Sequence, residues 1–486
     1  MNCTARFMAF LFLASMPLLA GTKWVEVRSS HFTVLTNGGA RQGREIAKRF
    51  EQMRLTFETL FTGVRTDPGK PFIIIAGSNR KSLAEFVPSF RKVPKQKTVA
   101  GIFVPTQTRY FAVIDLQYPG YGIINHEYVH MINQLNYAHL PLWLNEGFAE
   151  YFENLEVTGS RINIGAPRSN HLTLLSRFRP IPMDSFLATT HDSPNYNERN
   201  RVNIFYAQCW AFTHYLHNDA KAREQNLIGK FTSGMQRRLP VKLVTRQAFG
   251  DVKELDKSLR DYIKKRRFTY FPVKRKIKVD SKSFSKRTLE EAEILTWKGL
   301  FLAACREAEA ASFLERAIAL DPGMSLAHEG LGILHFSSQA AASSKHLQRA
   351  LELDPDAAIA HYLLASLLAR NYDLTQQDRA LIETHLKRVT QLNPNFAAAY
   401  ADLGELYARM EEDKDTALGL IGKAIQLEAG NLNHRFTMVR ALNRFGSYKS
   451  SVTLLQRMLN LTDSSRTKKK ILFLLEKANG FLHREN

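Results

Sequence analysis

A short motif in the first third of the chain has the residue types and spacing of a metal-binding site. His126, Glu127 and His130 belong to an HExxH sequence at residues 126–130. If this segment is helical, residues four positions apart lie one above the other, so both histidines can bind the same ion. Glu127 then lies close enough to contact a water molecule on that ion but is not aligned to be a ligand. We therefore predict that His126 and His130 bind Zn²⁺ and that Glu127 is the general base.

Glu146 is the predicted third ligand, because a catalytic zinc site combines three protein ligands with one open position. It lies in the segment WLNEGFAE at residues 143–150, which we expect to begin a second helix. Zinc lowers the pKa of its water from 15.7 toward about 7. Glu127 would take the proton as water attacks a carbonyl group and then pass it to the leaving amine. An HExxH sequence alone also occurs by chance on ordinary helices, but the downstream glutamate makes a chance match to the whole set far rarer.

Two further side chains could support this chemistry. A charged tetrahedral intermediate needs a hydrogen-bond donor on the other side of the carbonyl, and Tyr206 could supply its phenol there. Glu150 follows Glu146 by one helical turn and could accept the second ring N–H of a zinc histidine. Each has a structural alternative, since a tyrosine at a helix start is usually packed in the core and a glutamate on a helix is often only solvated.

The elements before the motif indicate an α+β unit built on a sheet. We expect a strand region at 23–37, a helix at 40–61, a strand at 71–76, a helix at 78–90, hairpin strands at 98–104 and 109–116, and the zinc helix at 122–135. A hairpin strand at the sheet edge could pair with an extended peptide through main-chain hydrogen bonds. The alternative is that both hairpin strands are internal.

The chain after Glu146 is less regular and mostly helical. We expect a hairpin at 157–165, a loop at 180–190, and helices at 203–217, 221–233 and 244–262. Tyr206 lies near the start of the first of these helices.

From residue 288 onward the sequence is repetitive. ALDP at 319–322 recurs as ELDP at 352–355 and QLNP at 391–394, with a degenerate copy, QLEA, at 426–429. Paired helices with a period near 34 residues are the signature of tetratricopeptide (TPR) repeats. The longer second interval predicts an insertion around 372–379. Stacked repeats form an all-α solenoid with a concave groove, and we expect this groove to bind a protein partner.

Composition and the first residues suggest where the protein acts. Residues 1–20 have a short basic start and an apolar run that is too short to span a bilayer, so we predict a signal peptide and a secreted or periplasmic protein. No other run is long enough for a transmembrane span. The formal net charge of +21 is consistent with a solvated basic surface or with binding of a polyanion. No nucleic-acid partner is expected.

The motif segments resemble the gluzincin metallopeptidases, whose third zinc ligand is the glutamate of a WLxEG segment. The closest layout is that of secreted bacterial proteins with a peptidase-MA-like domain joined to tetratricopeptide repeats. The resemblance implies a thermolysin-like catalytic domain with a mixed sheet, zinc, and hydrolysis of peptide bonds. It also strengthens the prediction that Tyr206 is catalytic. Aminopeptidase relatives carry a catalytic tyrosine in a helix of the form Tyr-x-x-Gly-x-x-x-x-x-Tyr-Leu. Residues 206–216 share that layout, except that Cys209 stands in place of the glycine.

The sequence departs from the aminopeptidase relatives in two places. The spacer between His130 and Glu146 is shorter, and the GxMEN segment that binds a free α-amino group is missing before residue 126. Endopeptidase action is therefore as consistent with the sequence as aminopeptidase action. The predicted domains are a signal peptide at 1–20, a gluzincin-like domain at 22–265, a basic connector at 266–287 and the repeats at 288–480. The alternative function is a catalytically silent scaffold that binds peptides at the cell envelope.

Overall fold

The computed structural model describes residues 23–86, 101–117, 122–197, 199–237, 239–265, 268–371, 373–411, 413–462 and 464–485. The predicted signal peptide at 1–20 lies outside these residues, as do positions 98–100 of one predicted strand and 87–90 of one predicted helix. In the described part of the chain, no helix is both long and apolar enough to cross a membrane.

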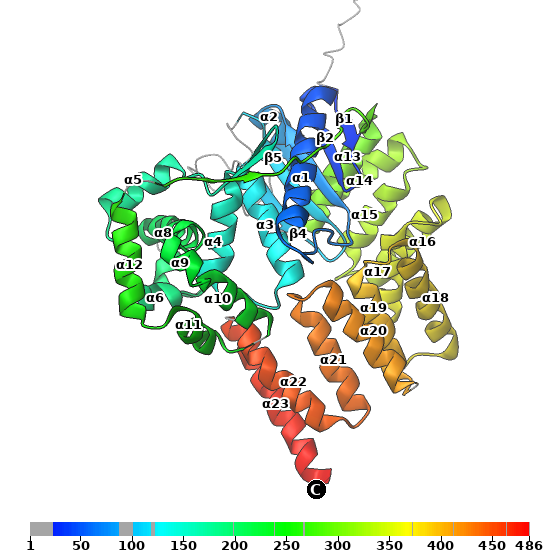
Figure 1. The fold of residues 1–486 in the computed structure, drawn as a ribbon. Helices are drawn as coiled ribbons and strands as arrows, with labels where there is room; N and C mark the ends of the chain where they lie inside the picture. The colour runs from blue at the N-terminus through cyan, green and yellow to red at the C-terminus, as the bar shows by residue number, and fades with distance from the viewer. Residues whose placement is uncertain are drawn as a thin grey trace, which may run out of the picture.

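A six-stranded mixed sheet forms the centre of the first part of the molecule (Figure 1). Its strands are β1 (Val25–Arg28), β2 (Phe32–Thr36), β3 (Phe72–Gly77), β4 (Gly101–Pro105), β5 (Tyr110–Asp115) and β9 (Ser285–Thr288). The order is β4-β5-β3-β2-β1-β9, with β2, β3 and β5 parallel and the other pairs antiparallel. The predicted hairpin is therefore present, with β4 at the edge of the sheet and β5 inside it.

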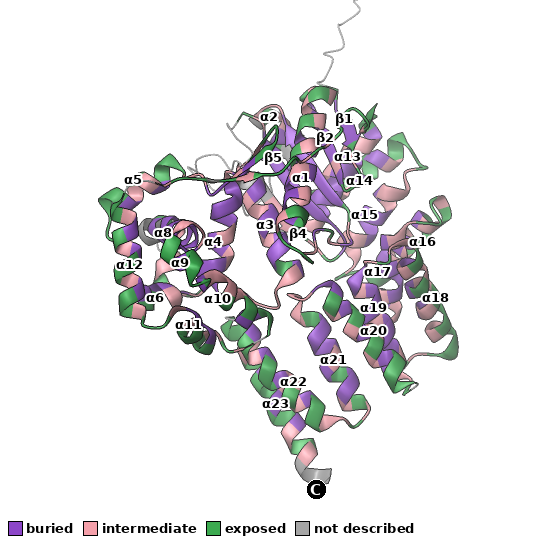
Figure 2. Cartoon of the chain, in the orientation of Figure 1, coloured by how far each residue is buried: buried purple, intermediate pink, exposed green. Residues whose placement is uncertain are grey.

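Helices cover both faces of this sheet, which explains why β3 is a continuous apolar run. On one face, Ile74 packs in a core with α1 (Gly39–Leu60) and α3 (Gly122–Asn136). On the other face, Ile73 and Ile75 share a core with α13 (Glu291–Ala304). Figure 2 shows the central strands of the sheet and α13 as mostly buried, whereas β9 at its edge is exposed. The first helix of the predicted repeat region is therefore part of the core of the sheet.

Helices after the metal motif form a second core around Trp143 and Trp210. The short elements before α3 are α2 (Arg80–Leu83) and η1 (Ala84–Phe86). The later helices are α4 (Leu142–Glu153), α5 (Ser169–Arg177), α6 (Met183–Leu187), α7 (Pro194–Asn197), α8 (Arg199–Asn218), α9 (Ala220–Glu224), α10 (Leu227–Gln236), α11 (Val241–Phe249) and α12 (Val252–Lys264).

Two of the predicted helices are each divided in the structure. The helix expected at 221–233 is interrupted because Asn226 has φ 49°, the left-handed conformation that ends α9 before α10 begins. The helix expected at 244–262 is interrupted by Gly250, which has φ 70° and precedes the Asp251 cap of α12. At both breaks the chain turns back toward α8, so the helices that follow pack against it.

The predicted connector at 266–287 contributes strands to both sheets. β8 (Phe271–Lys274) pairs with β7 (Arg161–Ile164), and β9 pairs with β1. β6 (Glu156–Thr158) completes the smaller three-stranded sheet, so the hairpin expected at 157–165 is present.

The remainder of the chain is a TPR-like array of packed helix pairs, which runs from the sheet toward α11 (Figure 1). After α13 its elements are α14 (Ala310–Leu320), α15 (Ser325–His335), α16 (Ala340–Leu353), α17 (Ala358–Leu368), α18 (Gln376–Leu392), α19 (Ala397–Arg409), α20 (Lys414–Leu427), α21 (Leu432–Arg444), α22 (Tyr448–Met458), η3 (Leu459–Leu461) and α23 (Ser465–Glu485). The predicted insertion is divided between a longer turn before α18 and α18 itself, which has 17 residues where α16 has 14.

The repeats are attached to the first part of the chain at several points beyond α13. Arg109 of the β4–β5 turn forms a buried ion pair with Glu329 of α15. The amide N–H of Gly430, just before α21, donates to the carbonyl oxygen of Gln134 at 2.9 Å. Near the end of the chain, the Ser465 hydroxyl lies 2.9 Å from Asp192 Oδ2. The solenoid therefore arches back over α3 and the helices that follow it.

Candidate metal centre

Helix α3 presents its two histidines on the side away from the sheet. Tyr128, Val129 and Ile132 are almost fully buried in the core beneath the helix. This burial fixes the rotation of α3, and the two Nε2 atoms of His126 and His130 lie 3.1 Å apart. The four-residue spacing of the two histidines therefore brings their imidazole rings side by side, as the sequence predicts.

Glu146 reaches the same point from α4. The helix begins after Pro141, and the buried Trp143 and Leu144 hold its first turn in the second core. Glu146 Oε2 lies 3.4 Å from His126 Nε2 and 3.5 Å from His130 Nε2. The oxygen is buried, and it has no hydrogen-bond partner within the described residues.

Two contacts hold α4 in place beside its neighbours. The Asn133 side-chain amide donates to Asn145 Oδ1 at 2.9 Å, which joins α3 to α4 next to the ligands. On the opposite side of α4, a Cβ added to Gly147 would lie 2.2 Å from Thr213 Oγ1 and 3.0 Å from the Cys209 carbonyl oxygen. The glycine of the WLNEG segment therefore permits the close packing of α4 against α8.

The charges at this point favour an ionised glutamate between the two histidines. Burial alone would raise the pKa of Glu146, but His126 and His130 outweigh it and lower the pKa to about 2. Burial alone would lower the pKa of His126, but Glu146 and then Glu150 raise it to about 9. Removing water from three ionisable groups is costly unless they are paired or bind a metal.

The three donors fit a divalent metal ion. In a tetrahedral zinc site with bonds of about 2.1 Å, donor atoms lie about 3.4 Å apart. The donor atoms of His126, His130 and Glu146 are separated by 3.1 to 3.5 Å. Two neutral imidazoles and one carboxylate are also a donor set that zinc accepts.

The two side chains with predicted catalytic roles lie around this triad. Glu127 is half-buried, and its charge acts on His126. The Tyr206 hydroxyl lies 3.4 Å from the hydroxyl of Tyr196. Burial, followed by the charge of Glu146 and the contact with Tyr196, raises the pKa of Tyr206 well above its usual value. The phenol therefore keeps its proton and can serve as a donor.

Glu150 lies on the far side of His126, but its hydrogen bond goes elsewhere. Its Oε1 is 3.8 Å from His126 Nδ1, which is longer than a hydrogen bond, while its Oε2 is 2.6 Å from His171 Nε2. Glu153 Oε2 lies 3.9 Å from the same His126 Nδ1 and accepts from Arg168 at 3.0 Å. Burial and then Glu150 raise the pKa of Glu153 to about 7.

The sequence analysis did not identify Glu153, His171, Arg168 or Tyr196. Glu153 follows Glu150 by three residues, as Glu150 follows Glu146 by four, and both spacings place side chains on one helix face, so the sequence held a signal for Glu153. His171 and Tyr196 come from α5 and α7, and only tertiary packing brings these helices to the site. Glu150, Glu153 and His171 form a buried polar cluster behind His126, and the exposed Arg168 reaches its two carboxylates from the surface.

Three cavities lie between the first part of the chain and the repeats. The metal cavity, of about 440 Å³, is lined by the candidate ligand His130 and by Gln134, Leu432 and Ser464 among others. The groove cavity, of about 490 Å³, also includes Gln134 in its lining and extends along the first helices of the later repeat pairs.

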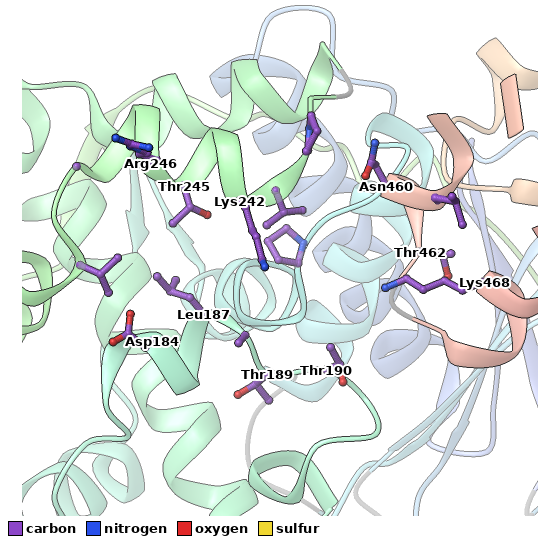
Figure 3. Close-up of a pocket in the computed structure, with 17 residues that line it drawn as sticks. Asp184, Leu187, Thr189, Thr190, Lys242, Thr245, Arg246, Asn460, Thr462 and Lys468 are labelled. Atoms are coloured by element: carbon purple, nitrogen blue, oxygen red, sulfur yellow. The ribbon is translucent and has the colours of Figure 1, made fainter. Parts of the chain in front are cut away.

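The third and largest cavity, of about 770 Å³, has a different lining. Its walls include Thr189 and Lys242 from the first part of the chain and Asn460 and Lys468 from the end of the repeats. Figure 3 shows Lys242 and Lys468 approaching it from α11 and α23. None of the candidate metal ligands lines this cavity, so its size does not make it the reaction site.

Comparisons with known proteins match the two parts of the chain separately. The model of a family described as "Protein of unknown function (DUF1570)" matches residues 122–242, an interval that begins with α3 and contains all the predicted site residues. No curated protein matches the chain.

Several solved structures of TPR proteins are similar to the chain. YrrB, described as a TPR protein with an unusual peptide-binding site, is 18% identical, with 39% of this chain and 92% of that chain covered and a TM-score of 0.31. A thermophilic TPR protein from Thermus thermophilus is 16% identical, with 39% and 98% covered and a TM-score of 0.32. Yeast Tom70 is 15% identical, with 74% and 73% covered and a TM-score of 0.27. The chain thus combines a segment similar to DUF1570, holding a His/Glu cluster that could bind a metal, with a TPR-like helical region.

Proposed function

We propose that the protein is a zinc-dependent peptidase that acts in a secreted or periplasmic compartment. The observation that carries the proposal is the triad of His126, His130 and Glu146. In it a buried carboxylate oxygen, which has no hydrogen-bond partner in the described part of the chain, faces two imidazole nitrogens. The presence of Glu127 favours a catalytic metal site over a purely structural one, because a structural site has no use for a general base beside the ligands.

The side chains around the triad have distinct roles in hydrolysis. A bound zinc ion supplies Lewis-acid chemistry, which activates water and polarises a substrate carbonyl. Glu127 accepts the proton of the attacking water and returns it to the leaving nitrogen. Tyr206, which keeps its phenolic proton, donates a hydrogen bond to the oxygen that becomes negatively charged.

The sheet edge offers a way to orient the substrate. β4 is the terminal strand of the larger sheet in the described part of the chain, and it contacts α3. An extended peptide that pairs with β4 would gain main-chain hydrogen bonds independent of its side chains. This arrangement favours internal cleavage of a bound polypeptide.

Zinc content and peptide cleavage test the proposal directly. We expect about one zinc ion per chain in the wild type, loss of zinc in His126→Ala, and retained zinc with at least 100-fold slower cleavage in Glu127→Gln. The control is Glu352→Gln, an exposed glutamate of α16, which should keep both zinc and activity. Stoichiometric zinc without turnover on a broad peptide library would refute the peptidase and leave a metal-binding scaffold.

A further inference from the structure

The metal cavity and the groove cavity meet at a single helix. Gln134 lines both, and it lies one helical turn after His130 on α3. Its side chain is exposed, and its carbonyl oxygen accepts the hydrogen bond from Gly430. Gln134 is therefore the wall that the two cavities share, and its side chain lies on the surface between them.

The groove cavity is part of the concave face of the repeat array. One wall comes from the first helices of successive pairs, with Tyr362 on α17, Asp402 on α19 and Arg440 on α21. The opposite wall comes from the first part of the chain, including Gln107 of the β4–β5 turn and Lys70. The concave face thus looks toward the metal-bearing part of the same molecule.

Buried ion pairs hold these two walls together. Lys70 Nζ lies 2.5 Å from Glu428 Oε1, and Arg109 lies 2.5 Å from Glu329, with all four side chains less than a tenth exposed. Breaking such pairs leaves buried charges without partners, so the walls are not free to separate. A cavity of this size holds an extended segment of chain and excludes a folded domain.

The lining of the groove cavity carries an excess of positive charge. Its cations are Lys70, Arg440 and Lys470, and its carboxylates are Asp402 and Glu428. Glu428 is already paired with Lys70. Lys470 Nζ lies 4.1 Å above the ring of Phe436, on the exposed part of α23. Arg440 is already paired with Glu405 at 3.1 Å, so Lys470 is the cation beside which an acidic side chain is the favoured occupant.

We propose that the repeat groove and the metal centre form one continuous site, which binds an unfolded polypeptide that carries acidic residues. This assignment rests on the peptidase function proposed above. The repeats select the substrate itself, in place of the separate protein partner that the sequence alone suggests. Folded proteins are excluded because the β4–β5 turn and Lys70 stand opposite the repeat helices and leave too little width for a domain.

Binding to the Glu127→Gln protein tests the assignment without requiring cleavage. The probe is a fluorescein-labelled, unstructured peptide of about 20 residues, about 70 Å long at full extension, with glutamates spaced along it. A matched peptide with lysine at each glutamate position tests the charge preference. We expect fluorescence anisotropy to show that the acidic peptide binds at least about tenfold more tightly than the lysine peptide.

Two variants in the same background locate the binding site. Lys470→Glu reverses the charge in the groove, and Asn433→Trp fills the groove from α21, where Asn433 is exposed. We expect each to weaken binding of the acidic peptide by about tenfold. The control is Lys469→Glu, because Lys469 is exposed on the same helix and is not among the residues lining the described cavities.

The outcomes separate this inference from the peptidase proposal. Unchanged affinity in both groove variants, or equal affinity for the two peptides, would overturn the assignment of the groove as a substrate site, even if the wild type cleaves peptides. Groove-dependent binding in a protein that never cleaves would support the binding site and refute the peptidase.

Discussion

At the residue scale, the candidate metal centre depends on a glutamate that is ionised although it is buried. Two histidines from α3 stabilise the charge of Glu146, and a zinc ion would replace them as its partner. Helical spacing predicted the two histidines, and the need for a third ligand together with the WLNEG segment predicted Glu146, so the sequence was sufficient to propose all three. The buried cluster of Glu150, Glu153 and His171, with the exposed Arg168 at its edge, could not be predicted in full, because α5 reaches the site only through packing against α8.

Tyr206 provides a test of catalysis at this scale. We expect Tyr206→Phe to lower kcat by about 10²- to 10³-fold with little change in KM, because it removes one donor to the developing oxyanion. The variant keeps the ring, so zinc content and thermal stability should stay close to the wild type. Steady-state kinetics on a peptide substrate measure the effect, and a wild-type kcat would rule out the donor role.

At the element scale, the distance between α4 and α8 sets the geometry of the site. The two helices carry Glu146 and Tyr206, and Gly147 lets them approach closely. HExxH and WLNEG predict that two helices exist, but they do not specify the distance from α4 to α8. That distance follows from the backbone of α8, where the Cys209 carbonyl oxygen faces Gly147.

Gly147→Ala tests this packing. The added methyl group would clash with Thr213, so we expect a loss of about 1–3 kcal/mol in the free energy of unfolding, together with weaker zinc binding. Gly419→Ala is the matched control, since a Cβ there has no neighbour within 4 Å and the residue lies in the interior of α20. The control should be stabilised by about 0.5–1 kcal/mol. Equal stability of the two variants in urea unfolding would contradict the packing argument.

At the scale of the whole molecule, buried ion pairs fix the repeats against the sheet. We expect Glu329→Gln to destabilise the protein by about 3–5 kcal/mol, because it leaves Arg109 buried without its counter-ion. Glu352→Gln removes a glutamate from an exposed ion pair with Arg349 and should change stability by less than about 1 kcal/mol. Thermal unfolding compares the two, and a similar small effect in both would mean that the repeats are held mainly by apolar contacts.

The buried ion pair between Lys70 and Glu428 makes the attachment of the repeats to the sheet sensitive to acid. Burial would raise the pKa of Glu428, but the hydrogen bond with His434 and the charge of Lys70 lower it to about 2 from an ordinary value of 4.5. The folded protein therefore binds fewer protons than the unfolded chain, and the stabilisation is complete above pH 4.5 and lost as the pH falls toward 2. We expect the difference in unfolding free energy between wild type and Glu428→Gln to shrink across this window. A difference independent of pH would show that Glu428 does not titrate as described.

Local patterns in the sequence were sufficient for the individual elements of this protein. Helical spacing predicted His126 and His130, the WLNEG segment predicted Glu146, alternation predicted the β4–β5 hairpin, and the recurring LDP and LNP segments predicted the repeat pairs. Each of these patterns spans only a few turns or strands. Only the folded chain shows that β4 is an edge strand, that α13 fills one face of the sheet, and that the concave face of the repeats looks toward the metal centre. These arrangements depend on contacts between residues hundreds of positions apart, such as Arg109 with Glu329 and Lys70 with Glu428, and no local periodicity records such contacts.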